Sequence, residues 1–208
     1  MNSPATPLEK EIPNHSLNEV DRKKYQIIYA DPPWFYNRRN LIGKSGKRNN
    51  FAWGASNHYP LMRTEEICKL PVQSIIDGNS ILFLWATFPR LTDALEVINA
   101  WGFKYITVGF VWVKTTKSGE IRMDGLGNYT MSNCEICLIA KKGKISRKKT
   151  GIKQIILHQK SKHSEKPTEA RDRIVKLMGD LPRVELFARQ KTEGWDVWGN
   201  EVESDIEL

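Results

Sequence analysis

The chain has 208 residues, of which 40% are hydrophobic and 27% charged, and its formal net charge is +8. This composition excludes a collagen-like or wholly disordered chain, and the length suits one domain with a substantial core. No run approaches the ~18 apolar residues of a membrane span, and no signal-peptide core is present at the N-terminus. The surplus of positive charge favours a polyanionic partner, of which nucleic acid is the commonest.

Five short apolar runs predict buried strands, because they are rich in β-branched and aromatic residues and stop at polar or turn-forming residues. They are YQIIYA (25–30), SILFLWAT (80–87), YITVGFVWVK (105–114), CEICLIA (134–140) and VELFA (184–188). Apolar spacing and end signals predict three helices between these runs. The predicted helices cover residues 64–69, 90–101 and 167–178.

The remaining segments divide the chain into a short lead-in, one main domain and a tail. Residues 1–24 form the lead-in, residues 25–200 the main domain, and residues 201–208 an acidic tail. Within the main domain, residues 35–57 and 115–133 are long polar loops, and such loops are usually functional or mobile. Alternating apolar strands and helices predict an α/β fold whose mostly parallel sheet is covered by helices on both faces.

Chemistry is expected just after the first strand, because ligands of such sheets bind beyond the carboxyl ends of the strands. There the chain reads Asp31-Pro32-Pro33-Trp34. The prolines remove two backbone donors and leave their carbonyl oxygens free to accept. Asp31 and the Pro32 carbonyl suit the two N–H bonds of an exocyclic amine on an aromatic base, and Trp34 suits its face. The alternative is a strand-ending turn with a buried Trp34.

The tetrapeptide D-P-P-W resembles the signature of the MT-A70-like family of S-adenosylmethionine-dependent N6-adenine methyltransferases. Further blocks match in the family's order. They are HYPLMRTEEICKLPV (58–72), ILFLWAT (81–87), WGFKYITVGFVWVK (101–114), GNYTMSNCEICLIAKKG (127–143), HSEKPTEARDRIVKL (163–177) and VELFARQKTEGWDVWGN (184–200). This resemblance implies a Rossmann-like methyltransferase fold over residues 25–200. It also implies a circularly permuted motif order, in which the catalytic tetrapeptide comes early and the cofactor blocks late.

The resemblance also implies roles for individual residues. Asp31, Pro32, Pro33 and Trp34 would be catalytic, and S-adenosyl-L-methionine would be the cofactor. Lys166 would hold the methionine carboxylate of the cofactor, and Asp31 would lie near its amine. The residues that would contact the ribose and adenine of the cofactor are Arg189, Gln190, Lys191, Thr192, Asn200 and Glu201.

Candidates for binding the substrate are basic and aromatic residues near the loops. They are Tyr36, Arg38, Arg39, His58, Tyr59 and Lys114. Two basic runs, in 35–53 and 141–153, are expected to flank the active edge and to hold phosphates. His58 and Tyr59 are equally well explained as a structural pair, and Lys114 as a solvated lysine. Glu135 is expected either to anchor the second loop or to act in catalysis.

Cys134 and Cys137 form a C-x-x-C pair, but no second pair or nearby histidine completes a zinc site. Because free cysteines are frequently buried, we expect packed thiols and no metal.

The resemblance and the residue patterns together suggest three functions. The first is methyl transfer to adenine N6 in DNA, which we favour because the chain has little room for RNA-recognition appendages. The second is the same reaction on RNA. The third is a catalytically silent nucleic-acid-binding subunit, against which the intact tetrapeptide and Lys166 argue. We expect an intracellular protein, from the cytoplasm of a prokaryote or its phage, or from the nucleus if eukaryotic, with no membrane contact and possibly a homo- or heterodimer.

Overall fold

The computed structural model describes residues 23–36, 60–123, 129–160 and 165–208. The strands are β1 (Tyr25–Ala30), β2 (Ile76–Ala86), β3 (Lys104–Thr115), β4 (Cys134–Lys142), β5 (Ile155–Gln159), β6 (Arg183–Leu186) and β7 (Asp196–Trp198). The α-helices are α1 (Thr64–Cys68), α2 (Leu91–Ala100) and α3 (Thr168–Met178), with 3₁₀ turns at Val72–Ser74 and Phe88–Arg90. No helix in these four described ranges is long and apolar enough to cross a membrane.

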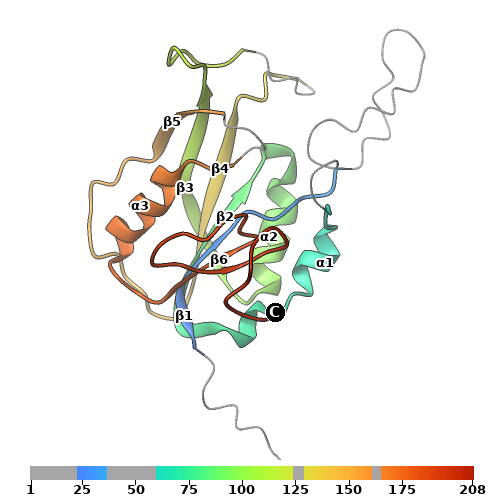
Figure 1. The fold of residues 1–208 in the computed structure, drawn as a ribbon, viewed down its shortest axis with the longest axis vertical. Helices are drawn as coiled ribbons and strands as arrows, with labels where there is room; N and C mark the ends of the chain where they lie inside the picture. The colour runs from blue at the N-terminus through green and yellow to red at the C-terminus, as the bar shows by residue number, and fades with distance from the viewer. Residues whose placement is uncertain (1–22, 37–59, 124–128, 161–164) are drawn as a thin grey trace, which may run out of the picture.

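The seven strands form one sheet in the order β5-β3-β4-β2-β1-β6-β7 (Figure 1). Neighbours are parallel at β1–β2, β1–β6, β3–β5 and β6–β7, and antiparallel on both sides of β4. The prediction of a mostly parallel sheet is therefore confirmed. β4 is the exception, since it runs against both of its neighbours.

Helices cover both faces of the sheet, as predicted (Figure 1). Ile67 of α1 and Val97 of α2 pack into one apolar cluster with Ile28 and Leu82 on one face. Ile174 of α3 packs into the second cluster on the other face, together with aromatic side chains of β2 and β3. A parallel strand buried on both faces requires apolar side chains at nearly every position, which explains why β1 and β2 read as continuous apolar runs.

We call the edge at which β1, β2, β3 and β6 end the carboxyl edge, and the opposite edge the amino edge. Ala30 of β1 pairs with Leu84 of β2 and Leu186 of β6, so the ends of these strands lie together. Because β4 is antiparallel, its beginning also lies at the carboxyl edge, where Ile136 pairs with Ala86.

The direction of β4 overturns one prediction about charge. The basic run 141–153 includes the last two residues of β4, and Lys141 pairs with Lys104, the first residue of β3, and with Ile81 of β2. This run therefore begins at the amino edge and does not flank the carboxyl edge. The other basic run, in 35–53, lies outside the described residues apart from Phe35 and Tyr36.

Candidate active site

The Asp31–Trp34 segment forms a tight turn directly after β1. The Pro32 carbonyl accepts a hydrogen bond from the Trp34 N–H at 2.9 Å. The Pro33 carbonyl accepts one from the Met62 N–H at 2.8 Å. The expectation that both carbonyls are free is therefore wrong, because the chain uses one lone pair of each to fix the turn. A carbonyl oxygen has two lone pairs, so each can still accept a second bond.

Trp34 is buried, with 5% of its surface exposed, and lies in the cluster that α1 and α2 cover. Its indole N–H donates to the Trp85 carbonyl at 3.2 Å. This environment matches the structural alternative, a buried Trp that holds the turn. The described residues leave little of its ring face for a base.

Four charged side chains lie in a line at the carboxyl edge. Lys166 Nζ is 2.6 Å from Asp31 Oδ2 and 3.2 Å from Glu135 Oε2. Glu135 Oε1 is in turn 2.6 Å from Lys114 Nζ. Lys166 and Glu135 are almost completely buried, whereas the Asp31 side chain is 22% exposed. Asp31 is therefore the member of the line that a substrate reaches first.

The line holds its groups in their charged forms. Burial alone would lower the pKa of Lys166, but the neighbouring Asp31 and Glu135 carboxylates raise it above its ordinary value. Burial alone would raise the pKa of Glu135, but Lys166 and Lys114 lower it below its ordinary value. A buried charge is tolerated only when it is paired, so each group in the line depends on its neighbours.

A second buried ion pair ties α3 to β6. Arg171 Nε and Nη2 each lie 2.6 Å from a carboxylate oxygen of Glu185, a two-bond geometry that also fixes orientation. The Arg171 guanidinium lies 5.5 Å over the Tyr29 ring of β1. The pair fixes the beginning of α3 against the sheet, and Lys166 lies just before that helix.

The predicted cofactor side is built by the segments that follow β6 and β7. Phe187 has a φ of 62°, a conformation that costs energy for a residue with a side chain. The Ala188 N–H donates to the Trp198 carbonyl at 2.9 Å, and a Cβ on Gly199 would meet the Ala188 oxygen at 2.1 Å. Only glycine allows this approach.

These two segments bring several predicted residues together. Arg189 Nε lies 3.6 Å from Glu201 Oε1, next to Asn200. The Gln190 amide donates to Glu165 at 3.0 Å. Predicted and unpredicted side chains together line a small cavity beside the turn: Tyr29, Asp31, Glu165, Lys166, Arg171, Glu185, Phe187, Arg189 and Gln190.

Other predicted site residues lie elsewhere or outside the described ranges. Lys191 pairs with Asp205 of the tail at 2.7 Å, and neither Lys191 nor Thr192 lines the cavity. The Tyr36 hydroxyl is bonded to Thr87 at 2.6 Å, in a buried setting that raises its pKa. Lys114 is committed to Glu135, which excludes the solvated alternative. Arg38, Arg39, His58 and Tyr59 lie outside the described residues.

The two cysteines of the C-x-x-C pair lie on β4. Residues three apart in a strand point to opposite faces, so the two thiols cannot share a metal ion. Cys137 is buried and Cys134 half-buried, and burial raises the pKa of both. Cys137 is therefore a packed thiol, as predicted.

Arg171 and Glu185 were missed by the sequence-based prediction. The available signal was a charge inside each apolar pattern, since Arg171 lies beside Ala170 on the buried stripe of α3 and Glu185 interrupts the apolar run of β6. A buried charge at such a position requires a partner of opposite charge, and Arg171 and Glu185 are each other's partner.

Comparison with known proteins gives matches over most of the chain. The family model MT-A70 matches residues 25–201. The chain is 38% identical to "Type II methyltransferase M.MunI" from Mycoplasma sp, over all of this chain and 88% of the relative. It is 26% identical to human "N(6)-adenine-specific methyltransferase METTL4", over 87% of this chain but 38% of that protein.

A further relative is the Arabidopsis thaliana "N6-adenosine-methyltransferase non-catalytic subunit MTB", which is 29% identical over 64% of this chain and 16% of that protein. The family model covers the turn, the charge line and the predicted cofactor side in one continuous match. The resemblance inferred from the sequence is thereby confirmed: the chain belongs to the MT-A70 family.

Proposed function

We propose that the chain transfers a methyl group from S-adenosyl-L-methionine to the N6 amine of adenine in DNA. The observation that carries this proposal is the environment of Asp31. One of its carboxylate oxygens is bound by buried Lys166. The side chain lies at the carboxyl edge, beside a turn in which the two prolines have no N–H to donate. This arrangement aims a carboxylate at a group that donates hydrogen bonds, as an exocyclic amine does.

The donor set of the small cavity suits the cofactor. Asp31 offers an anion for its amine and Lys166 a cation for its carboxylate, and Arg189 and Gln190 offer polar groups for its ribose and adenine. Glu201 pairs with Arg189 but does not line the cavity. The cavity has a volume of about 20 Å³, and two of the side chains that line it, Gln190 and Glu165, are bonded to each other. Because this volume is far smaller than that of the cofactor, cofactor binding requires lining side chains to move. The cofactor supplies an electrophilic methyl group.

Asp31 prepares the amine for attack. The adenine amine is a weak nucleophile because its lone pair is delocalised into the ring. Hydrogen bonds from its two N–H groups to Asp31 and to the second lone pair of the Pro32 carbonyl would draw the nitrogen toward tetrahedral geometry. The Asp31 carboxylate would then stabilise the positive charge that develops on the nitrogen while the N–C bond forms and the methyl–sulfur bond breaks. The sulfur would leave as a neutral thioether, and the surplus N6 proton would pass to solvent. Alignment and electrostatics would therefore supply most of the acceleration.

Lys166 and Glu135 position Asp31. Lys166 binds one carboxylate oxygen, so the carboxylate cannot rotate freely, and Glu135 holds Lys166 from the other side. The two carboxylates also compete for Lys166 with the carboxylate expected from the cofactor. Cofactor binding would therefore redistribute the bonds of Lys166 without removing its charge.

DNA is favoured over RNA by one of the relatives. The relative at 38% identity spans nearly the same length and carries the name of a type II methyltransferase, a class that modifies DNA. The net charge of +8 suits a polyanion of either kind. The silent-subunit alternative is disfavoured because Asp31 and Lys166 are both present and in contact.

The test is transfer of labelled methyl from S-adenosylmethionine to unmethylated genomic DNA, the same DNA made single-stranded, and total RNA, followed by nucleoside analysis. We expect N6-methyladenine in DNA. Methylcytosine as the product, or label in RNA alone, would contradict the proposal. Absence of transfer together with no calorimetric signal for cofactor binding would favour the silent subunit.

A further inference from the structure

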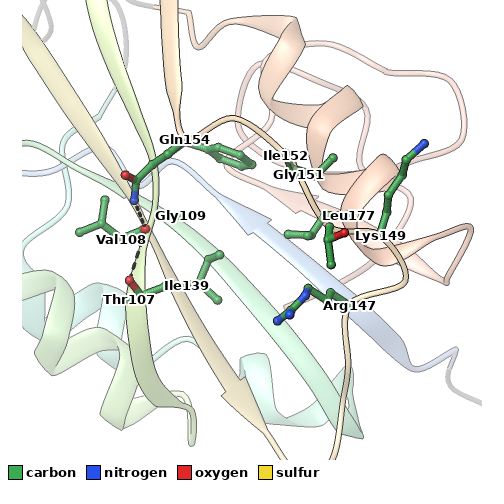
Figure 2. A pocket seen from close by; sticks show the side chains of 12 residues that line it. Thr107, Val108, Gly109, Ile139, Arg147, Lys149, Gly151, Ile152, Gln154 and Leu177 are labelled. Atoms are coloured by element: carbon green, nitrogen blue, oxygen red, sulfur yellow. Dashed lines mark hydrogen bonds between the residues drawn. The ribbon is translucent and has the colours of Figure 1, made fainter.

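A groove of about 390 Å³ lies on the face of the sheet that carries α3, away from Asp31 (Figure 2). Its floor includes Phe110 of β3 and Ile139 of β4, and Leu177 lies at its α3 side. Its wall is the segment 147–154, which we call the strap. The volume falls within the range of ligand-binding pockets.

The strap is fixed at both ends. The backbone N–H groups of Lys148 and Lys149 donate to the Leu177 carbonyl at 2.8 and 3.2 Å. At the other end, the Gln154 amide donates to the Val108 carbonyl of β3 at 2.6 Å, and Arg173 of α3 donates to the Lys153 carbonyl at 2.5 Å. The groove is therefore formed before any ligand binds.

The groove is strongly basic. Residues 136–164 contain no Asp or Glu. The run from the end of β4 through the strap contributes seven cations: Lys141, Lys142, Lys144, Arg147, Lys148, Lys149 and Lys153. Within the described part of the chain, Arg147 and Lys149 have no acidic partner. Figure 2 shows Arg147 directed toward the sheet and Lys149 directed outward at the rim.

Helix α3 connects this groove to the candidate active site. Lys166 lies just before α3, and Leu177 near its end lines the groove. The 11 residues of α3 span about 16 Å. Successive nucleotides of one DNA strand are about 3.4 Å apart, so the length of α3 corresponds to roughly five nucleotides. A strand that ran along α3 from an adenine at Asp31 would therefore have phosphates at the groove.

We propose that the strap groove binds the phosphodiester backbone of the nucleic acid, several nucleotides from the target adenine. Arg147 and Lys149 contact phosphates, and the apolar floor contacts the sugar edge. This inference rests on the proposed function, since it requires a nucleic-acid substrate. It assigns phosphate binding to the α3 face of the sheet. The basic run 141–153 follows this face because β4 runs antiparallel to its neighbours.

The test compares the intact chain with the double variant Arg147→Ala/Lys149→Ala. Binding of a fluorescent 30-base-pair duplex of mixed sequence is measured by anisotropy at 50 to 200 mM salt. Each lost phosphate contact should reduce the slope of log K against log salt by about 0.9. The double variant should therefore lose about two units of slope and bind about 10- to 100-fold more weakly at low salt.

Two controls keep the result specific. Lys24→Ala/Lys69→Ala removes the same charge from exposed lysines just before β1 and just after α1, and should leave the slope within half a unit of that of the unmodified chain. Arg147→Lys/Lys149→Arg keeps the charge and should keep the slope. Equal slopes for the alanine double variant and the Lys24/Lys69 control would overturn the proposal and leave the groove to another partner, such as an acidic protein segment.

The experiments distinguish a failure of the proposed function from a failure of the groove proposal. If the unmodified chain methylates no nucleic acid, the proposed function fails whatever the strap variants do. If it methylates DNA while the Arg147/Lys149 variant binds duplex as the control does, only the groove proposal fails. Cofactor titration of each variant reports folding independently of DNA, because the strap lies outside the small cavity.

Discussion

Asp31, Lys166, Glu135 and Lys114 form a line of alternating charge whose members differ in exposure. The inner two are nearly buried, and Asp31 at the outer end is open enough to meet a substrate. The buried pair alone would be a costly way to stabilise a fold, because desolvation offsets most of its attraction. We infer that the line is present to position the Asp31 carboxylate.

Glu135 gives the first prediction. Glu135→Gln leaves two lysines at a buried site without their shared counter-charge, and breaking a buried pair costs about 3 kcal/mol or more. Urea unfolding at pH 7 should show this loss. The matched control is Glu169→Gln, which breaks a half-exposed pair with Arg173 and should cost less than about 1 kcal/mol.

The pH dependence of this difference follows from the pKa of Glu135. Folding lowers this pKa below its ordinary value of 4.5, so the folded state gains stability from the ionised carboxylate above pH 4.5. That contribution is lost as the pH falls through the lowered folded value. The stability gap between the unmodified chain and Glu135→Gln should therefore narrow below pH 4.5. A constant gap down to the acid transition would contradict the ion-pair explanation.

At the scale of elements, α3 connects the buried charges to the sheet. Arg171→Met should destabilise the chain by about 3–5 kcal/mol, because it leaves Glu185 buried and unpaired. The double variant Arg171→Met/Glu185→Leu should recover most of that loss, as replacing a buried pair with apolar residues is often neutral or better. Thermal or urea unfolding checks both. Equal stability of the single and double variants would show that the pair is not coupled.

The segment after β7 is constrained by backbone approach. Gly199→Ala places a Cβ against the Ala188 backbone, which has to move, so we expect a cost of about 1–3 kcal/mol. Because Ala188 precedes Arg189, cofactor affinity by calorimetry should fall about tenfold. Gly78→Ala is the control, since a Cβ there meets nothing within 4 Å and should leave cofactor affinity unchanged. Unchanged affinity in Gly199→Ala would separate this segment from the cofactor site.

Local pattern predicted most elements but not their directions. The five predicted strands are all present, because each carries the apolar run that burial on both faces requires. β5 was missed because Ile155 and Leu157 are exposed beside buried Ile156, and β7 because it has only three residues. The antiparallel course of β4 is a property of the assembled sheet, so the basic run after it was placed at the wrong edge.

The candidate site was predictable to the extent that its residues are close in sequence. Asp31 was identified from its place after a strand and before two prolines. Lys166 had no such signal, since its partners are far away in the sequence: Asp31 follows β1 and Glu135 lies on β4. Its role came from the family resemblance, and the structure adds that it is buried and paired with both carboxylates.

At the scale of the whole molecule, the candidate active site and the start of the basic run 141–153 lie at opposite edges of the sheet. Asp31, Lys166 and the predicted cofactor side lie at the carboxyl edge, whereas the run 141–153 starts at the amino edge and follows the α3 face. The acidic tail joins the body, since Asp205 binds Lys191 and Leu208 packs on the core. A nucleic acid that follows the strap would therefore approach Asp31 along α3.

The most direct measurement is the rate of methyl transfer to adenine N6 in DNA by Asp31→Asn, at saturating cofactor. This change keeps the shape of the side chain and removes its charge. We expect the rate to fall by about 10²–10³-fold, the size of one lost electrostatic contact in a transition state. Asp196→Asn, which alters a similarly exposed aspartate paired with Lys23, should keep the rate. A rate for Asp31→Asn within a few-fold of the unmodified chain would contradict the assignment of Asp31 as the catalytic carboxylate.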